Sequence, residues 1–243
     1  DPQKISLPPV DPAQPRHPFW PAEILTEPLI RNYLHGYYSC IACVDWCIGE
    51  ILKVIKEEGY WDNSIIIYLS DHGESGGYHG KFEKHCFFEQ DVKVPLILRW
   101  PAVQSTRIAE IVELIDLAPT LCEICGIDTR DYRFDGKSLV PLLSGNKRDW
   151  KNYAISEYYT VEHTEPDGTY VPESWGRMLV KDGFKCCIAG NMPYPFTLFD
   201  LKNDPEEFRN LWDDPQYRTK KEEMLELLKK DWKKLQNPFE WKY

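Results

Sequence analysis

The sequence predicts an α/β fold, with part of a doubly wound, mostly parallel sheet core followed by a small C-terminal antiparallel sheet packed with a terminal helix. Three observations predict it. A long amphipathic segment precedes an almost wholly apolar run, a second apolar run follows a glycine-rich loop, and the later part of the chain changes to short aromatic-rich runs. Alternating helices and buried strands are typical of α/β cores, and closely spaced short strands are typical of antiparallel sheets.

The predicted core elements follow one another in the first half of the chain. Residues 1–24 are rich in proline, which favours an extended segment. Apolar residues recur at intervals of three and four over residues 27–58, which predicts one long amphipathic helix. Residues 64–69 are apolar at nearly every position, as in a strand buried on both faces. A second strand is predicted over 94–100, and a helix follows it near 112–125.

The pattern changes near residue 150. We therefore predict a first domain over residues 1–150, the α/β core, and a small C-terminal α+β subdomain over 151–243. Residues 160–175 read as a solvated loop, and apolar residues at helical spacing over 215–236 predict a terminal helix on the sheet. The strands predicted in this subdomain are 153–159, 176–180, 184–188 and 197–200.

Composition excludes some classes of partner. The chain has 29 basic and 39 acidic residues, a net charge of −10, which argues against nucleic acid because phosphate backbones require clustered Lys and Arg. No apolar run approaches the roughly 20 residues of a membrane span, and the first residues do not resemble a signal peptide. We expect a soluble protein, and the sequence does not define its compartment.

The cysteines favour packing over metal binding. Five of the eight lie in helix-patterned segments at spacings of three, four and seven, which would place them on a buried helix face rather than in a structural zinc site. These five are Cys40, Cys43, Cys47, Cys122 and Cys125.

Chemistry is concentrated in the loop that follows the first predicted strand. Asp71 and His72 stand where that strand ends, the edge at which open α/β sheets bind ligands, and Gly73 permits a sharp turn. An adjacent carboxylate and imidazole can both reach one divalent cation. His79 and Lys84 add donors and positive charge, so the loop would suit a tetrahedral oxyanion.

These residues resemble the sulfatases of the alkaline-phosphatase superfamily. The tetrapeptide Ser-Asp-His-Gly at 70–73, the block Gly-Tyr-His-Gly-Lys-Phe-Glu-Lys at 77–84 and Val-Pro-Leu-Ile at 94–97 follow that family's motifs in order and spacing. Phe82 stands where the family usually has tryptophan. The resemblance covers roughly residues 28–235, and its later blocks are 116–121, 135–139 and 198–205.

The resemblance implies roles for four residues. Asp71 and His72 would be ligands of one divalent metal ion, most commonly Ca²⁺ in this family, with Mn²⁺, Mg²⁺ or Zn²⁺ as alternatives. Lys84 would contact the sulfate group, and His79 would contact substrate or support the loop. The implied substrate is a sulfated small molecule or carbohydrate.

The family's nucleophile motif is absent from this sequence. No Cys-x-Pro-x-Arg or Ser-x-Pro-x-Arg segment occurs in the 243 residues, so the resemblance implies the C-terminal half of a sulfatase, inactive alone and dependent on the missing N-terminal half as its partner. Two alternatives remain open. One is a phosphonate monoester or phosphodiester hydrolase of the same superfamily, and the other is a non-catalytic assembly or binding module.

Overall fold

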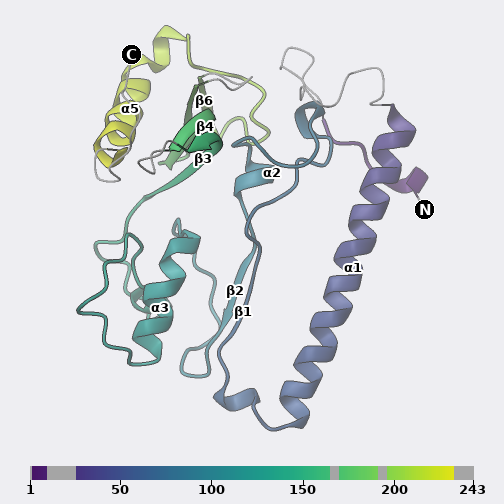
Figure 1. Cartoon of the computed structure of the whole chain (residues 1–243), viewed down its shortest axis with the longest axis vertical. Coiled ribbons are helices and arrows are strands. Elements are labelled where there is room, and N and C mark those ends of the chain that lie inside the picture. Colours follow the sequence, from purple (N-terminus) through teal and green to yellow (C-terminus); the bar gives the residue numbers. More distant parts are fainter. Residues whose placement is uncertain (1, 10–25, 165–169, 191–195, 233–243) are drawn as a thin grey trace. The chain divides into compact units, whose positions relative to one another are not determined.

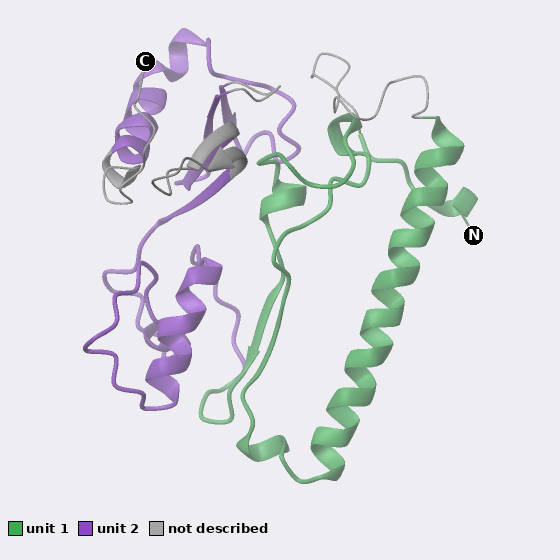
Figure 2. Cartoon of the chain, viewed as in Figure 1, with its two compact units in different colours: residues 1–104 green, residues 105–243 purple. Residues whose placement is uncertain are grey.

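The computed structural model describes residues 2–9, 26–164, 170–190 and 196–232. The chain divides into two compact units, residues 1–104 and residues 105–243, which Figure 2 colours separately. The boundary near residue 150, inferred from the change of sequence pattern, stays a prediction. The α/β class, the small antiparallel sheet and the C-terminal helix are confirmed.

Unit 1 contains one long helix. Helix α1, Glu27–Glu57, confirms the helix predicted from apolar periodicity, and Figure 1 shows it as one uninterrupted element. Pro28 lies in its first turn, where a missing N–H leaves no hydrogen bond unmade. Gly59, with a φ of 76°, takes the left-handed conformation just beyond the helix and ends it.

The two strands of unit 1 form an antiparallel pair. Strand β1, Ile66–Leu69, pairs with β2, Leu96–Arg99, so that Ile66 lies opposite Arg99. This pairing differs from the parallel arrangement that two apolar strands favoured. A parallel crossover usually runs through a full helix that packs on the sheet, whereas the connection between β1 and β2 contains only two short helices, η3, Tyr78–Gly80, and α2, Glu89–Val92.

Unit 2 begins with short helices that a buried charge cluster ties to the small sheet. Asp116, fully buried before helix α3 (Leu117–Ile124), accepts hydrogen bonds from the Lys151 ammonium at 2.7 Å and from the Lys137 backbone N–H at 2.8 Å. Glu113 contacts the same ammonium and accepts a bond from the Ile155 backbone N–H at 2.7 Å. Because each carboxylate is paired, this burial of charge is tolerated.

A four-stranded antiparallel sheet, in the order β3-β4-β5-β6, follows in unit 2 and confirms the predicted small sheet. The expectation of a loop over residues 160–175 is wrong for the described part of that stretch, because strand pairing continues to Thr164 opposite Tyr170. Backbone pairing with two register shifts satisfies the peptide groups of a stretch whose composition suggested a loop. The strands are β3 Tyr153–Thr164, β4 Tyr170–Lys181, β5 Phe184–Gly190 and β6 Thr197–Asp200.

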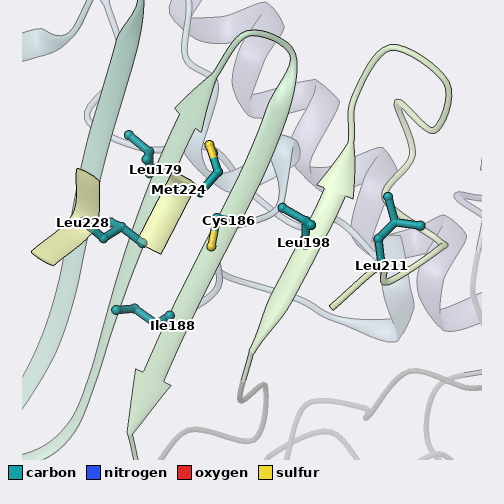
Figure 3. Packing of buried hydrophobic residues seen from close by; sticks show 7 residues of the cluster. All are labelled: Leu179, Cys186, Ile188, Leu198, Leu211, Met224 and Leu228. Atoms are coloured by element: carbon teal, nitrogen blue, oxygen red, sulfur yellow. The ribbon is translucent and has the colours of Figure 1, made fainter. Parts of the chain in front are cut away.

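Helix α5, Arg218–Trp232, covers this sheet and completes a compact core. It confirms the predicted terminal helix, whose last expected residues, 233–236, lie outside the described residues. Figure 3 shows Met224 and Leu228 of the helix packed with side chains from the strands. The buried cluster consists of Leu179, Cys186, Ile188, Leu198, Leu211, Met224 and Leu228. The short remaining helices are η1 Pro2–Lys4, η2 Trp61–Asn63, η3 Tyr78–Gly80, η4 Leu114–Asp116, α4 Val140–Leu143 and η5 Pro215–Tyr217.

Helix α1 keeps an apolar side exposed. Leu34 is its one buried residue, whereas Tyr37, Ile41, Val44 and Ile51, which fall on one side of the helix, are exposed. We call these four the α1 stripe.

The cysteines of α1 are exposed too. Cys40, Cys43 and Cys47 all face solvent, so the prediction of a buried cysteine face is wrong there. The helical spacing was read correctly, but the described residues of unit 1 do not cover this part of the helix. None of the described helices is both long and apolar enough to cross a membrane.

Candidate active site

The candidate site lies in the segment between β1 and β2, which we call the site loop, residues 70–92. Its first residues turn back against its last ones at Gly73. A Cβ at Gly73 would lie 1.8 Å from the carbonyl oxygen of Gln90, so this close approach requires glycine. The Gly73 N–H donates to the backbone oxygen of Asp91 at 2.7 Å. The loop therefore closes on itself directly beside His72.

Hydrogen bonds on both sides of the His72 ring define its tautomer. Nδ1 lies 2.8 Å from the Gly73 carbonyl oxygen, which can only accept, so Nδ1 carries the proton. Nε2 lies 2.9 Å from Nζ of Lys84, an ammonium that can only donate, so Nε2 offers its lone pair. A neutral imidazole with an unprotonated Nε2 and an Nδ1–H bonded to a carbonyl is the form that binds metal ions.

Asp71 stands beside this lone pair. Its Oδ2 lies 3.5 Å from Nε2 of His72. A hydrogen bond from the His72 backbone N–H lowers the pKa of Asp71, and the positive charge of Lys84 acts in the same direction. Asp71 is therefore an ionised, solvent-exposed carboxylate at neutral pH.

Lys84 is presented by an unusual stretch of backbone. The residues on either side of it, Glu83 and His85, have φ values of 64° and 96°, which residues other than glycine rarely adopt. Glu83 is bonded twice to the first part of the loop: its carbonyl accepts from Ser75 N–H at 2.8 Å, and its N–H donates to the Glu74 carboxylate at 2.7 Å. These bonds oppose the strain and hold the backbone directly before Lys84.

His79 is placed differently from the other three predicted residues. Its ring is buried and stacks on Phe88, with ring centroids 3.8 Å apart. Its backbone is also left-handed, with a φ of 52°. Phe82, the residue that departs from the family motif, is buried as well and packs edge-on against Tyr33 at 4.6 Å. The structure thus brings Asp71, His72 and Lys84 together and places His79 within the packed interior of the loop.

The donor set suits a divalent cation but is incomplete. A carboxylate and a neutral imidazole are common ligands of divalent metals, and the ionised Asp71 lies beside the Nε2 lone pair of His72, which accepts a hydrogen bond from Lys84 in this structure. Within the part of the chain that the structure describes, no three His, Cys, Asp or Glu side chains are grouped to hold a metal. Further ligands would have to come from elsewhere.

Sequence reasoning missed three residues of the site loop, the buried Ser75 and Asp91 and the half-buried Cys86. The Asp91 carboxylate accepts a hydrogen bond from the Ser75 hydroxyl at 2.8 Å and another from the Cys86 thiol at 2.7 Å. Asp91 and Ser75 are both almost inaccessible to solvent. The sequence offers no signal for this contact, because the three residues are separated along the chain and no local pattern pairs them.

Comparisons with known proteins identify the family of this chain. The family model described as "N-sulphoglucosamine sulphohydrolase, C-terminal" matches residues 77–234, and the model described as "Sulfatase" matches residues 9–127. An N-acetylglucosamine-6-O-sulfatase from Bacteroides thetaiotaomicron is 30% identical over 205 residues, which are 82% of this chain and 35% of the relative.

Two solved structures have a similar fold. A phosphonate monoester hydrolase of Agrobacterium radiobacter superposes with a TM-score of 0.75 at 27% identity over 86% of this chain and 43% of its own. A structure in complex with D-glucosamine-2-N,6-O-disulfate gives a TM-score of 0.72 at 27% identity, covering 90% of this chain and 44% of its own. The chain thus spans about a third of the curated relative and less than half of each solved chain. Since one family model matches well over half of the chain and a sulfatase relative is 30% identical across most of it, the chain belongs to the sulfatase family of the alkaline-phosphatase superfamily.

Proposed function

We propose that this chain is part of an enzyme that hydrolyses sulfate esters, and that it supplies Asp71, His72 and Lys84 to the metal and sulfate site. The observation that carries the proposal is the 2.9 Å contact between Nζ of Lys84 and Nε2 of His72, with the Asp71 carboxylate alongside. A cation, an anion and a metal-binding lone pair meet at one point of a loop that belongs to a sulfatase.

Each residue has a distinct task in this proposal. Asp71 and His72 would hold one divalent cation, which supplies positive charge that polarises the sulfate group. The ion is Ca²⁺ by family resemblance, and the imidazole also admits Mn²⁺ or Zn²⁺. Lys84 would place its ammonium against the sulfate oxygens, where negative charge must be stabilised as the ester bond breaks.

Lys84 would have two alternative hydrogen-bond acceptors, Nε2 of His72 and the sulfate oxygens of the substrate. The Nε2 lone pair of His72 can accept a hydrogen bond from Lys84 or bind a cation, and it cannot do both. Lys84 would therefore lose its present acceptor when a cation is held, and its ammonium would become available to substrate. His79, proposed for substrate contact or loop support, is buried and stacked in this structure, which favours loop support.

The proposed activity requires residues beyond these 243. The chain spans about a third of its curated sulfatase relative, and the sequence contains no formylglycine motif. The exposed α1 stripe agrees with a fold that is completed by another segment. We therefore propose that the other half of the sulfatase fold is the partner of this chain and supplies the nucleophile and the remaining metal ligands.

A sulfated carbohydrate is the proposed substrate class. The relative from Bacteroides thetaiotaomicron is named for an N-acetylglucosamine sulfate, and one similar structure contains a disulfated glucosamine. A phosphonate monoester is the second candidate, favoured by the structural similarity to a phosphonate monoester hydrolase. Comparing 4-nitrophenyl sulfate with a phenyl phosphonate ester on the longer protein separates the two, and a large preference for the phosphonate would overturn the sulfatase proposal.

Replacing Lys84 tests the site directly. In the longer protein, Lys84→Ala should lower kcat/KM for an aryl sulfate by roughly 10²- to 10³-fold and leave the unfolding midpoint unchanged. The substitution removes only the positive charge that would face the sulfate oxygens. Lys93→Ala is the matched control, since Lys93 is largely exposed and pairs only loosely with Glu89 at 3.8 Å. Equal activity of the two variants would remove Lys84 from the site.

A further inference from the structure

The site loop has two arms, one that follows His72 and one that follows Lys84, and they meet at the buried carboxyl group of Asp91. Oδ1 of Asp91 accepts a hydrogen bond from the Ser75 hydroxyl at 2.8 Å, and Oδ2 accepts one from the Cys86 thiol at 2.7 Å. The backbone oxygen of Asp91 also accepts the Gly73 N–H at 2.7 Å. Asp91 therefore holds the arm that follows His72 and the arm that follows Lys84 at the same time.

These bonds act next to strained backbone. Lys84 lies between two residues with left-handed φ values, Glu83 and His85, and each such residue costs about 1–3 kcal/mol unless its surroundings hold it. Cys86 directly follows this strained pair, so its bond to Asp91 anchors the end of the strained stretch. On the other arm, Ser75 bonds Glu83 through its N–H and Asp91 through its side chain.

The arrangement is costly for a purely packing role. Asp91 is 3% exposed, and both of its carboxyl oxygens are bonded by neutral donors, a hydroxyl and a thiol, rather than by a cation. Burial raises the pKa of Asp91, and the bonds from Cys86 and Ser75 oppose that rise. Burial also raises the pKa of Cys86, so its thiol stays protonated and able to donate. In some proteins a buried polar group of this kind is retained because it defines one particular geometry.

We propose that Asp91 is a positioning residue, which through Ser75 and Cys86 sets the distance and orientation between Lys84 and His72. Without the Asp91 carboxylate the two arms keep their backbone contacts but lose the side-chain link that joins Ser75 to Cys86. The Lys84 ammonium and the His72 lone pair would then no longer face one another. This role rests on the proposed function of Lys84 and His72, and its geometric part can be tested without activity.

The test follows the His72 ring by NMR in the 243-residue chain labelled with ¹⁵N-histidine. In the unsubstituted chain, His72 should show a protonated Nδ1 and an unprotonated Nε2 that shifts when Lys84 is replaced. Cys86→Ala, which removes one of the two bonds to Asp91, should change the Nε2 signal in the same direction as Lys84→Ala. Cys86→Ser, which keeps an O–H donor, should restore it, a rescue that general loss of packing would not produce.

Asp91→Asn tests the acceptor itself, with Asp62→Asn as its control. An amide keeps the shape but offers one acceptor oxygen in place of two, so the Nε2 signal should change as in Cys86→Ala. Asp62 is 96% exposed in its side chain, and its replacement should leave the ring unaffected. If Asp91→Asn fails to fold, as judged by circular dichroism, the two Cys86 variants decide alone. An unchanged His72 spectrum in Cys86→Ala would overturn the proposal.

Kinetic measurements separate the positioning role of Asp91 from the proposed function. In the longer protein, Cys86→Ala should lower kcat for an aryl sulfate about tenfold or more with little change in KM, because a small misplacement of a reacting group is costly, and Cys86→Ser should recover most of it. If the unsubstituted protein hydrolyses no sulfate ester, the proposed function fails while the NMR result stands. If the protein is active and Cys86→Ala matches it in kcat and in the His72 signal, the positioning role fails.

Discussion

The small sheet of unit 2 and the long helix of unit 1 treat apolar side chains in opposite ways. In the sheet subdomain, Leu179, Leu198 and Leu228 are completely buried. Along α1, Ile41, Val44 and their neighbours in the α1 stripe stay exposed over several turns. Both regions show clear amphipathic patterns in the sequence. The difference teaches that periodicity identifies the apolar side of a helix or strand. Whether that side is buried depends on the other elements that pack against it.

This contrast agrees with how much of the family fold the chain spans. The described core residues of the small sheet all belong to unit 2 and come mainly from its strands and α5. In proteins most helical stability comes from packing of an amphipathic face, and the described residues of unit 1 leave this face of α1 uncovered. We therefore expect substitutions in the small sheet to affect stability strongly, and substitutions on the α1 stripe to affect assembly instead.

The largest effect is expected at the buried ion pair of the small sheet. Nζ of Lys185 lies 2.9 Å from Oε1 of Glu207, and both side chains are completely buried. Glu207→Ala would leave the ammonium buried without this carboxylate, so the free energy of unfolding of unit 2 should fall by about 3–5 kcal/mol. Urea denaturation followed by near-ultraviolet circular dichroism measures it. A change below about 1 kcal/mol would show that water or another group replaces the carboxylate.

A matched pair of leucines compares the two regions directly. Leu228 in α5 is completely buried and Leu29 in α1 is 42% exposed. Leu228→Ala should cost about 2–5 kcal/mol of unfolding free energy because it opens a cavity, whereas Leu29→Ala should cost well under about 1 kcal/mol. Both substitutions occur in helices, so differences in helix propensity cancel. Equal losses would mean that α1 is covered in solution.

Polar substitution of the α1 stripe tests assembly. Ile41→Gln with Val44→Gln should change the thermal midpoint of the 243-residue chain by only a few degrees, since both side chains are exposed. In the longer protein the same change should lower stability and activity, because it places amides in a covered interface. Differential scanning calorimetry of the 243-residue chain and of the longer protein measures the thermal midpoints, and an aryl sulfate assay measures the activity. Unchanged stability and activity of the longer protein would exclude the α1 stripe as a packing surface.

The smallest effect is expected in the acid range. Hydrogen bonds from Lys220 and then Lys181 lower the pKa of Glu223. A carboxyl group with a lowered pKa in the folded state stabilises the fold above its ordinary pKa, and this contribution is lost as the pH falls through the lowered value. Glu223→Gln should therefore make the fall in thermal midpoint below about pH 4.5 less steep. The effect should be small because the group is partly exposed. An unchanged pH profile would show that these bonds do not persist in solution.

Local patterns were sufficient to predict several elements, and they pointed to the candidate site, whose residue roles stay a prediction. The three- and four-residue periodicity predicted α1 and α5, and strand-like runs predicted the four-stranded sheet. The motif at residues 70–84 drew attention to Asp71, His72 and Lys84, which the structure brings together. Such predictions succeed because each depends on residues close in sequence, where backbone geometry alone determines which side chains share a face or a turn.

Other features depend on contacts between distant residues. The antiparallel pairing of β1 with β2 and the extension of the β3–β4 hairpin arise from backbone hydrogen bonds whose partners no local pattern identifies. Asp91 has no motif of its own, and its position between Ser75 and Cys86 appears only once the site loop closes at Gly73.

Burial is the property that the sequence predicted least well. The cysteines of α1 have the spacing of a buried face and are exposed, whereas Lys185 and Glu207 are charged and completely buried. Both outcomes have one physical reason. The sequence by itself determined which residues form each helix and strand and which side of each is apolar, whereas exposure to water depends on every other element packed against that side, which is a property of the folded chain as a whole.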